Sequence, residues 1–137
     1  MKNAIHLPPP LVNELLQHAQ SNESHEICGL ISGHSGKPTR CYRIDNIARD
    51  STIRYEMKPE QQIAALRDMR QRGETLFAIY HSHPSSPAVP SRTDISEAGY
   101  PEALYLIISL STKGVLEMRG FYLDNAGVSE VVLEVGD

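Results

Sequence analysis

The sequence has little of what marks several classes of protein. Among its 137 residues it has no tryptophan, two phenylalanines and two cysteines. Two cysteines do not make a disulfide framework, so we expect a reducing compartment, the cytoplasm. No stretch approaches the roughly 18 apolar residues needed to span a bilayer, and residues 1–6 lack the apolar core of a signal peptide. With no internal repeat, low-complexity segment or linker, the whole chain, residues 1–137, is expected to be one domain.

Positive charge is also scarce. The chain has 13 Lys and Arg against 17 Asp and Glu, a net charge of −4. A mildly acidic chain gives no reason to expect nucleic acid or an anionic membrane as a partner. Arg67, Arg70 and Arg72 lie close together, but they fall at the end of a predicted helix, where basic side chains complement the helix dipole. We therefore expect a soluble protein with neither kind of partner.

Short apolar segments of two periodicities run through the chain. Helical spacing is present at about residues 10–21 and from Pro59 to Gly73, where Ile63, Leu66 and Met69 form the expected buried stripe. Strands are expected at 27–32, 39–46, 76–80, 104–110, 115–123 and 128–135, and a short helix at 93–98. This pattern predicts a compact α/β domain, a mixed sheet of about six strands flanked by helices.

The most informative stretch is Tyr80-His81-Ser82-His83-Pro84, at the end of a buried strand. Side chains two apart on a strand share a face, so His81 and His83 leave the strand together. Asp94 follows after a loop stiffened by three prolines. Two neutral imidazoles and one carboxylate are the protein ligands of a catalytic zinc, whose fourth position stays open for water. The stretch therefore predicts a zinc site.

Other patterns have simpler interpretations. Ser91 and Asp94 have the spacing of a helix capping box, in which Ser91 is the N-cap. His6, His18, His25 and His34 have no partner at ligand spacing and are taken as surface residues. The segment Gly33–Lys37 is no phosphate-binding loop, because its spacing puts Ile31 where the first glycine should be and Pro38 where Ser or Thr should be.

Five positions resemble the signature of the JAMM (MPN-plus) family of zinc-dependent proteases and isopeptidases. The family pattern is an upstream Glu, then His-x-His-Pro, with ten residues between the second His and an Asp, and a Ser three before that Asp. The matching residues here are Glu26, His81, His83, Ser91 and Asp94. The resemblance extends over most of the chain and is closest to the small bacterial members. It implies an MPN fold, similar to the cytidine-deaminase-like core.

The resemblance also implies a role for each residue. His81, His83 and Asp94 would hold one zinc ion, and Glu26 would be the general base that takes the water's proton. Glu23, in the polar segment between the first helix and the first strand, is the alternative base. Ser91 would donate to the oxyanion, and we expect this role or the cap to dominate. Cys28 is expected to be a small buried residue, with a redox or inhibitory contact to the zinc as the alternative.

The function implied is a zinc-dependent peptidase or isopeptidase that hydrolyses the amide after the C-terminal Gly-Gly of a ubiquitin-like sulfur-carrier protein. We expect the site at the sheet's edge, with small residues around it and no deep apolar pocket for a bulky side chain. Eukaryotic deubiquitinases of this family carry an insertion after this position that helps them grip ubiquitin chains. The short stretch after Asp94 has no room for it, which argues against deubiquitination, the alternative isopeptidase activity. The alternative is a catalytically silent MPN scaffold, but such members typically lack a metal ligand or the glutamate, and this chain has all of them. A zinc deaminase would show Cys-x-x-Cys and His-x-Glu, which are absent.

Overall fold

The protein was analysed as a computed structural model, which describes residues 4–112 and 115–136. Its centre is a six-stranded mixed sheet with strand order β3-β2-β4-β5-β6-β7. These strands are β2 (Cys28–His34), β3 (Lys37–Ile44), β4 (Thr75–His83), β5 (Leu104–Ser109), β6 (Glu117–Asp124) and β7 (Gly127–Val131). The helices are α1 (Pro9–Gln20), α2 (Pro59–Gln71) and α3 (Arg92–Glu97). The predicted α/β class, with about six strands, is confirmed.

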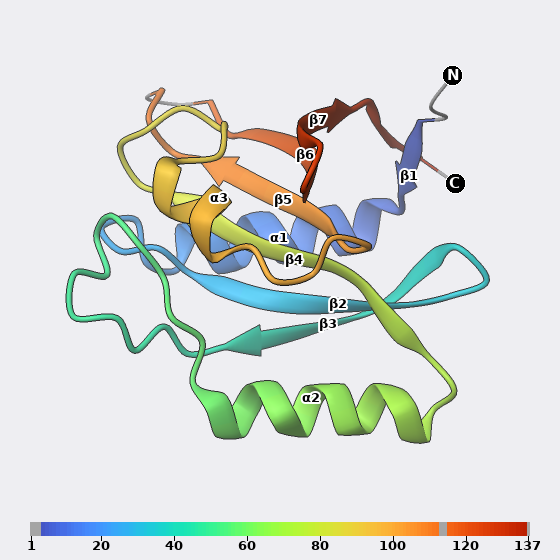
Figure 1. Ribbon diagram of the computed structural model, residues 1–137. Helices are drawn as coiled ribbons and strands as arrows, with labels where there is room; N and C mark the ends of the chain where they lie inside the picture. Colours follow the sequence, from blue (N-terminus) through green and yellow to red (C-terminus); the bar gives the residue numbers. More distant parts are fainter. Residues whose placement is uncertain (1–3, 113–114, 137) are drawn as a thin grey trace.

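Helices cover both faces of the sheet (Figure 1). Alternate residues of β4 belong to two separate cores: Ile79 packs with Met69 of α2, and Tyr80 packs with Leu15 of α1. This alternation follows from the period of two along a strand. His81 and His83 continue the Ile79 series, so they emerge on the face that α2 covers.

The site does not lie at the sheet's edge, as the sequence interpretation had it. β4 is an interior strand that pairs antiparallel with β2 and parallel with β5. All six residues of β5 are buried, in agreement with the prediction of a central strand. The carboxyl ends of β4 and β5 therefore lie side by side, and the end of β4 is enclosed by neighbouring strands.

A second, two-stranded sheet is absent from the sequence prediction. The single strand expected at 128–135 is divided after β7, and its last part, β8 (Leu133–Val135), pairs in parallel with β1 (Ile5–Leu7). This pairing joins the two ends of the chain. No local pattern predicts such a contact, because three-residue strands depend on a partner far away in the sequence.

Two residue assignments were wrong. Ile63 is 56% exposed, and the buried residues of α2 are Ala65 and Met69. His18 is buried rather than on the surface, and its Nδ1 lies 2.7 Å from the Tyr80 hydroxyl. Burial, with a smaller contribution from the nearby Arg43, lowers the pKa of His18 to about 4. Within the described residues, no helix is both long and apolar enough to cross a membrane.

Candidate metal centre

Three potential ligands meet at the end of β4. His81 and His83 are its last alternate residues, and Asp94 comes from the first turn of α3. All three side chains are buried: the exposed fractions are 1%, 2% and 9%. Their ligand atoms form a group that could hold a metal ion. The β4 pairings fix the two histidines, whereas Asp94 depends on the start of α3.

The geometry of this group matches a tetrahedral ion. His81 Nε2, His83 Nε2 and Asp94 Oδ2 form a triangle with each side 3.1 Å long. Ligand atoms about 2.0–2.1 Å from a tetrahedral zinc lie about 3.3 Å from one another. Two imidazole nitrogens and a carboxylate oxygen that face one another this closely need a shared proton or a cation between them. The donor set therefore fits a metal ion.

The charges of the three groups are coupled. Burial lowers the pKa of His81, and its hydrogen bond with Asp94 only partly opposes this. For His83 burial acts in the same direction, but hydrogen bonding to Asp94 and Pro87 outweighs it and raises the pKa. Burial opposes ionisation of Asp94 as well, yet the two histidines hold its pKa well below the usual range. The carboxylate is thus ionised and ready to bind a cation.

The loop after β4 orients His83. Its Nδ1 donates to the Pro87 carbonyl at 2.8 Å, which leaves the Nε2 lone pair directed at the ligand group. Such outer hydrogen bonds fix the tautomer and ring orientation of metal-binding histidines. The loop is held in turn by Ser109 of β5, whose hydroxyl donates to the Ser86 carbonyl at 2.7 Å. His81 is positioned differently, by the Tyr55 ring at a centroid distance of 4.6 Å.

Ser91 is the N-cap of α3. Its Oγ accepts from the Asp94 amide at 2.9 Å, and Asp94 Oδ2 accepts from the Ser91 amide at 2.9 Å, which completes a capping box. The two roles considered for the Ser91 hydroxyl, helix cap and oxyanion donor, do not exclude each other. A capping hydroxyl uses an oxygen lone pair, so its O–H remains able to donate.

Glu26 lies two residues before β2 begins and is 4% exposed. Its Oε1 is buried and has no hydrogen-bond partner among the described residues. Burial raises its pKa to about 7, with His83 opposing and Asp94 adding to the shift. Glu23, the alternative base, is exposed in the turn after α1. A buried carboxyl group without a partner, electrostatically coupled to the ligands, is suited to exchange protons with a molecule bound there.

Cys28 is structural in this arrangement. It is fully buried opposite His81, and its Sγ donates to the Ile44 carbonyl at 3.4 Å. Burial first, then the charges of Glu26 and Asp45, raises its pKa to about 12. The thiol therefore stays protonated and packs in the core, which fits the simpler of the two sequence interpretations.

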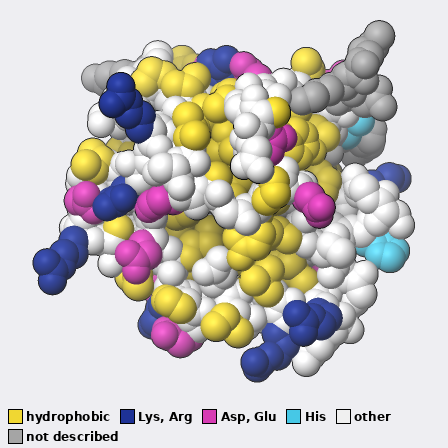
Figure 2. All heavy atoms as spheres, viewed as in Figure 1, with side chains coloured by type: hydrophobic (Ala, Val, Ile, Leu, Met, Phe, Trp, Pro, Cys, Tyr) yellow, Lys and Arg dark blue, Asp and Glu magenta, His cyan; other side chains and the backbone are white. Residues whose placement is uncertain are grey.

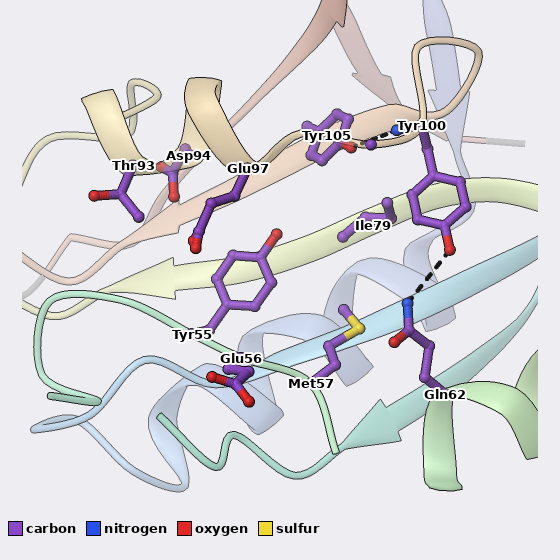
Figure 3. Close-up of a pocket in the computed structure, with 11 residues that line it drawn as sticks. Tyr55, Glu56, Met57, Gln62, Ile79, Thr93, Asp94, Glu97, Tyr100 and Tyr105 are labelled. Atoms are coloured by element: carbon purple, nitrogen blue, oxygen red, sulfur yellow. Dashed lines mark hydrogen bonds between the residues drawn. The ribbon is translucent and has the colours of Figure 1, made fainter. Parts of the chain in front are cut away.

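A cavity of about 250 Å³ adjoins Asp94 (Figure 3). Its walls come from α2 and the segment before it, from β4, α3, β5 and the α3–β5 connection: Tyr55, Glu56, Met57, Gln62, Ile79, Thr93, Asp94, Glu97, Gly99, Tyr100 and Tyr105. Hydrophobic side chains gather across the middle of this face, whereas Lys and Arg are scattered around it (Figure 2). Polar and apolar side chains both line this cavity, and its tyrosines come from separate segments, so no local pattern predicts it.

One ion pair holds Glu97, a residue of the cavity wall. Arg54, from the segment before α2, donates to both carboxylate oxygens of Glu97 on α3 at 3.3 Å. Gln62 donates to the Tyr100 hydroxyl at 3.4 Å across another part of the rim. These contacts tie α2 and the segment before it to α3 and the α3–β5 connection, all of which contribute to the cavity wall.

The chain is similar to known proteins over most of its length. The family described as "Prokaryotic homologs of the JAB domain" matches residues 8–121. The CysO-cysteine peptidase of Mycobacterium tuberculosis is 32% identical over 127 residues, which cover 91% of this chain and 86% of that protein. The desampylase of Haloferax volcanii is 33% identical over 103 residues, which cover 71% of this chain and 74% of the desampylase.

Solved structures share the fold. A solution structure from Desulfitobacterium hafniense has a TM-score of 0.84 and 32% identity, covering 96% of this chain and 92% of that one. A JAB1/MPN domain protein from Archaeoglobus fulgidus has a TM-score of 0.65 and 20% identity, covering 95% and 97%. At 20% identity the second similarity shows the fold alone, and it confirms the MPN-type architecture.

Proposed function

Because the chain belongs to the prokaryotic JAB family, we propose that it is a zinc-dependent peptidase of ubiquitin-like sulfur-carrier proteins. The bond cut is the amide directly after the carrier's C-terminal Gly-Gly. The observation that carries the proposal is the 3.1 Å triangle of His81, His83 and Asp94, whose charges act on the buried carboxyl group of Glu26. The retention of all five signature residues argues against a silent scaffold.

His81, His83 and Asp94 would hold the ion, and the zinc would lower the pKa of its bound water toward about 7 and polarise the scissile carbonyl. Glu26 takes the water's proton and passes it to the leaving amine. A pKa of about 7 suits both steps, because the group accepts and releases a proton near neutral pH. Burial keeps competing bulk water away from the carboxylate.

Ser91 stabilises the oxyanion that forms on the scissile carbonyl. Its hydroxyl accepts from the Asp94 amide at 2.9 Å, so the hydroxyl proton can be donated to the substrate oxygen. The cap also fixes the direction of this donor, because Ser91 and Asp94 hold each other through two hydrogen bonds. One residue thus positions a ligand and supplies a donor.

Two features support a carrier-tail substrate. The relatives that match are named for the cleavage of CysO-cysteine and for desampylation. Ser85, Ser86 and Ala88, which follow the two histidines in the chain, are small, and this favours a tail without side chains next to the cut. Residues further up the tail would then lie among the tyrosines of the cavity.

Substitution of Ser91 should separate its two roles. Ser91→Ala is expected to lower turnover by about 10- to 10³-fold and stability by about 1 kcal/mol, with zinc retained. Ser91→Gly should lower turnover equally but cost only a few tenths of a kcal/mol, about the loss expected for glycine at an N-cap. Ser96→Ala, on the same helix, is the control, and steady-state kinetics with thermal melts make the measurement. Full turnover in Ser91→Gly would reduce Ser91 to a cap.

The proposed function is tested with a ubiquitin-like carrier that ends in Gly-Gly followed by one amino acid. Intact-mass measurement should show loss of that amino acid after incubation with the zinc-loaded protein. Changing the penultimate glycine to valine should reduce cleavage by at least about 100-fold, because a β-branched side chain adds bulk next to the cut that a groove suited to glycine excludes. Equal cleavage of unrelated unfolded proteins would make the protein a general protease and reject the assignment.

A further inference from the structure

The backbone of Glu26 is held by a segment outside the sheet. The ladder between β2 and β4 extends only as far as Ile27, whose amide donates to the Ser82 hydroxyl and whose carbonyl accepts from the Ser82 amide. The Glu26 amide instead donates to the Ser51 carbonyl at 2.7 Å, and its carbonyl accepts from Asn46 Nδ2 at 2.9 Å. Both partners belong to residues 46–57, between β3 and α2.

Asn46 determines the shape of that segment. Its Nδ2 also donates to the Arg54 carbonyl at 3.0 Å, and its Oδ1 accepts from the amides of Ala48 and Glu56, each at 3.0 Å. An asparagine amide has two donors and two acceptor sites, and all four are used. Two carbonyls on one side and two amides on the other allow only one orientation of the group. No other side chain type offers this set at this length.

The carboxyl group of Glu26 depends on this arrangement. Its Oε1 has no hydrogen-bond partner among the described residues, so its direction is set mainly by the backbone and by packing. Misplacing a reacting group by about 1 Å can cost about 10²-fold in rate. The same segment carries Tyr55, whose ring lies against His81. Residues 46–57 therefore contact both Glu26, the proposed base, and His81, a proposed metal ligand.

We propose that Asn46 is a positioning residue for catalysis, which acts by fixing the backbone of Glu26 relative to the metal centre. This inference rests on the proposed function, because it assigns proton transfer to Glu26. It goes beyond the five signature residues, since Asn46 reaches neither the ligands nor the substrate. Asn46 would affect turnover only by positioning Glu26.

The test measures kcat, KM, zinc content and thermal stability of Asn46→Ala on a Gly-Gly-tailed carrier. We expect kcat to fall about 10- to 100-fold with KM within about threefold and zinc near one equivalent. Asn46→Ser is the second variant, because its hydroxyl can still bond the amide two residues on but is too short to reach Glu26. We expect Asn46→Ser to show the same loss of kcat, about 10- to 100-fold, and it replaces Asn46→Ala in the test if that variant does not fold.

Gln61 supplies a matched control. Its amide makes a similar pair of hydrogen bonds, to the amide and carboxylate of the neighbouring Asp45, without contacting Glu26. Gln61→Ala should leave kcat within about twofold of the wild-type value. A loss equal to that of Asn46→Ala would show that any disturbance here lowers turnover, and would overturn the inference.

A double-mutant cycle tests the route through Glu26. In the Glu26→Gln background, Asn46→Ala should change the residual kcat by less than about twofold, since the group it positions no longer transfers protons. The same factor in both backgrounds, or a loss confined to KM, would overturn the inference while leaving the proposed function intact. Full activity of Glu26→Gln alone would instead reject the proposed function.

Discussion

His83→Ala is expected to leave the protein with no more than about a tenth of an equivalent of zinc, against about one in the wild type. The substitution removes one corner of the 3.1 Å triangle and leaves His81 and Asp94 as the remaining ligands. Two protein ligands hold zinc poorly. Elemental analysis of protein purified without added metal is the measurement, and turnover should fall below detection with it.

The matched control is a histidine that does not belong to the ligand group. His34 is exposed, with Nδ1 3.3 Å from the Gly73 carbonyl, so His34→Ala should keep its zinc and its activity. A chelator should lower the melting temperature of the wild type and leave that of His83→Ala unchanged, because only the folded state with three ligands binds the ion. Full zinc in His83→Ala would reject this ligand set.

The sequence was sufficient for most of the sheet. The hairpin of β2 and β3 could be predicted because glycine and serine separate two strand-like runs; in the structure Ser35 and Gly36 take φ of 52° and 78°, as a two-residue turn between strands requires. β5 could be predicted from its continuous apolar run. The β1–β8 pair could not, because its strands are short and each depends on the other end of the chain.

The site was only partly predictable, for the same physical reason. His81 and His83 share a face by strand geometry, and Ser91 and Asp94 share a helix turn, so their spacings carry local information. The cavity beside Asp94 carries none, because Tyr55, Tyr100 and Tyr105 meet only in the folded chain. Asn46 has no local signature either: its partner Glu26 lies twenty residues earlier.

The burial of His18 shows a further limit. Histidine is found both inside and outside proteins, so its spacing could not distinguish a surface residue from one bonded to Tyr80. Tyr80 immediately precedes His81 and points to the opposite face, where α1 packs. The strand that presents the ligands is therefore anchored on its far side by a polar contact that the sequence does not reveal.

Glu26→Gln is expected to keep zinc at one equivalent while turnover falls by about 10² to 10⁴. The amide preserves the size of the side chain but accepts no proton near neutral pH. Glu26 is not a corner of the ligand triangle, so the ion has no reason to leave. The variant thus separates metal binding from proton transfer. Parallel measurements of zinc content and kcat provide the test.

Glu23→Gln is the matched control, because it makes the same chemical change three residues earlier at an exposed position. It should retain wild-type turnover. The reverse result, with Glu23→Gln inactive and Glu26→Gln active, would move the base to the turn after α1. Removing the carboxyl group of Glu26 also replaces a buried ionisable group with a neutral one, so stability should not fall through loss of charge. A large drop in turnover without a drop in melting temperature is the outcome that assigns Glu26 to proton transfer.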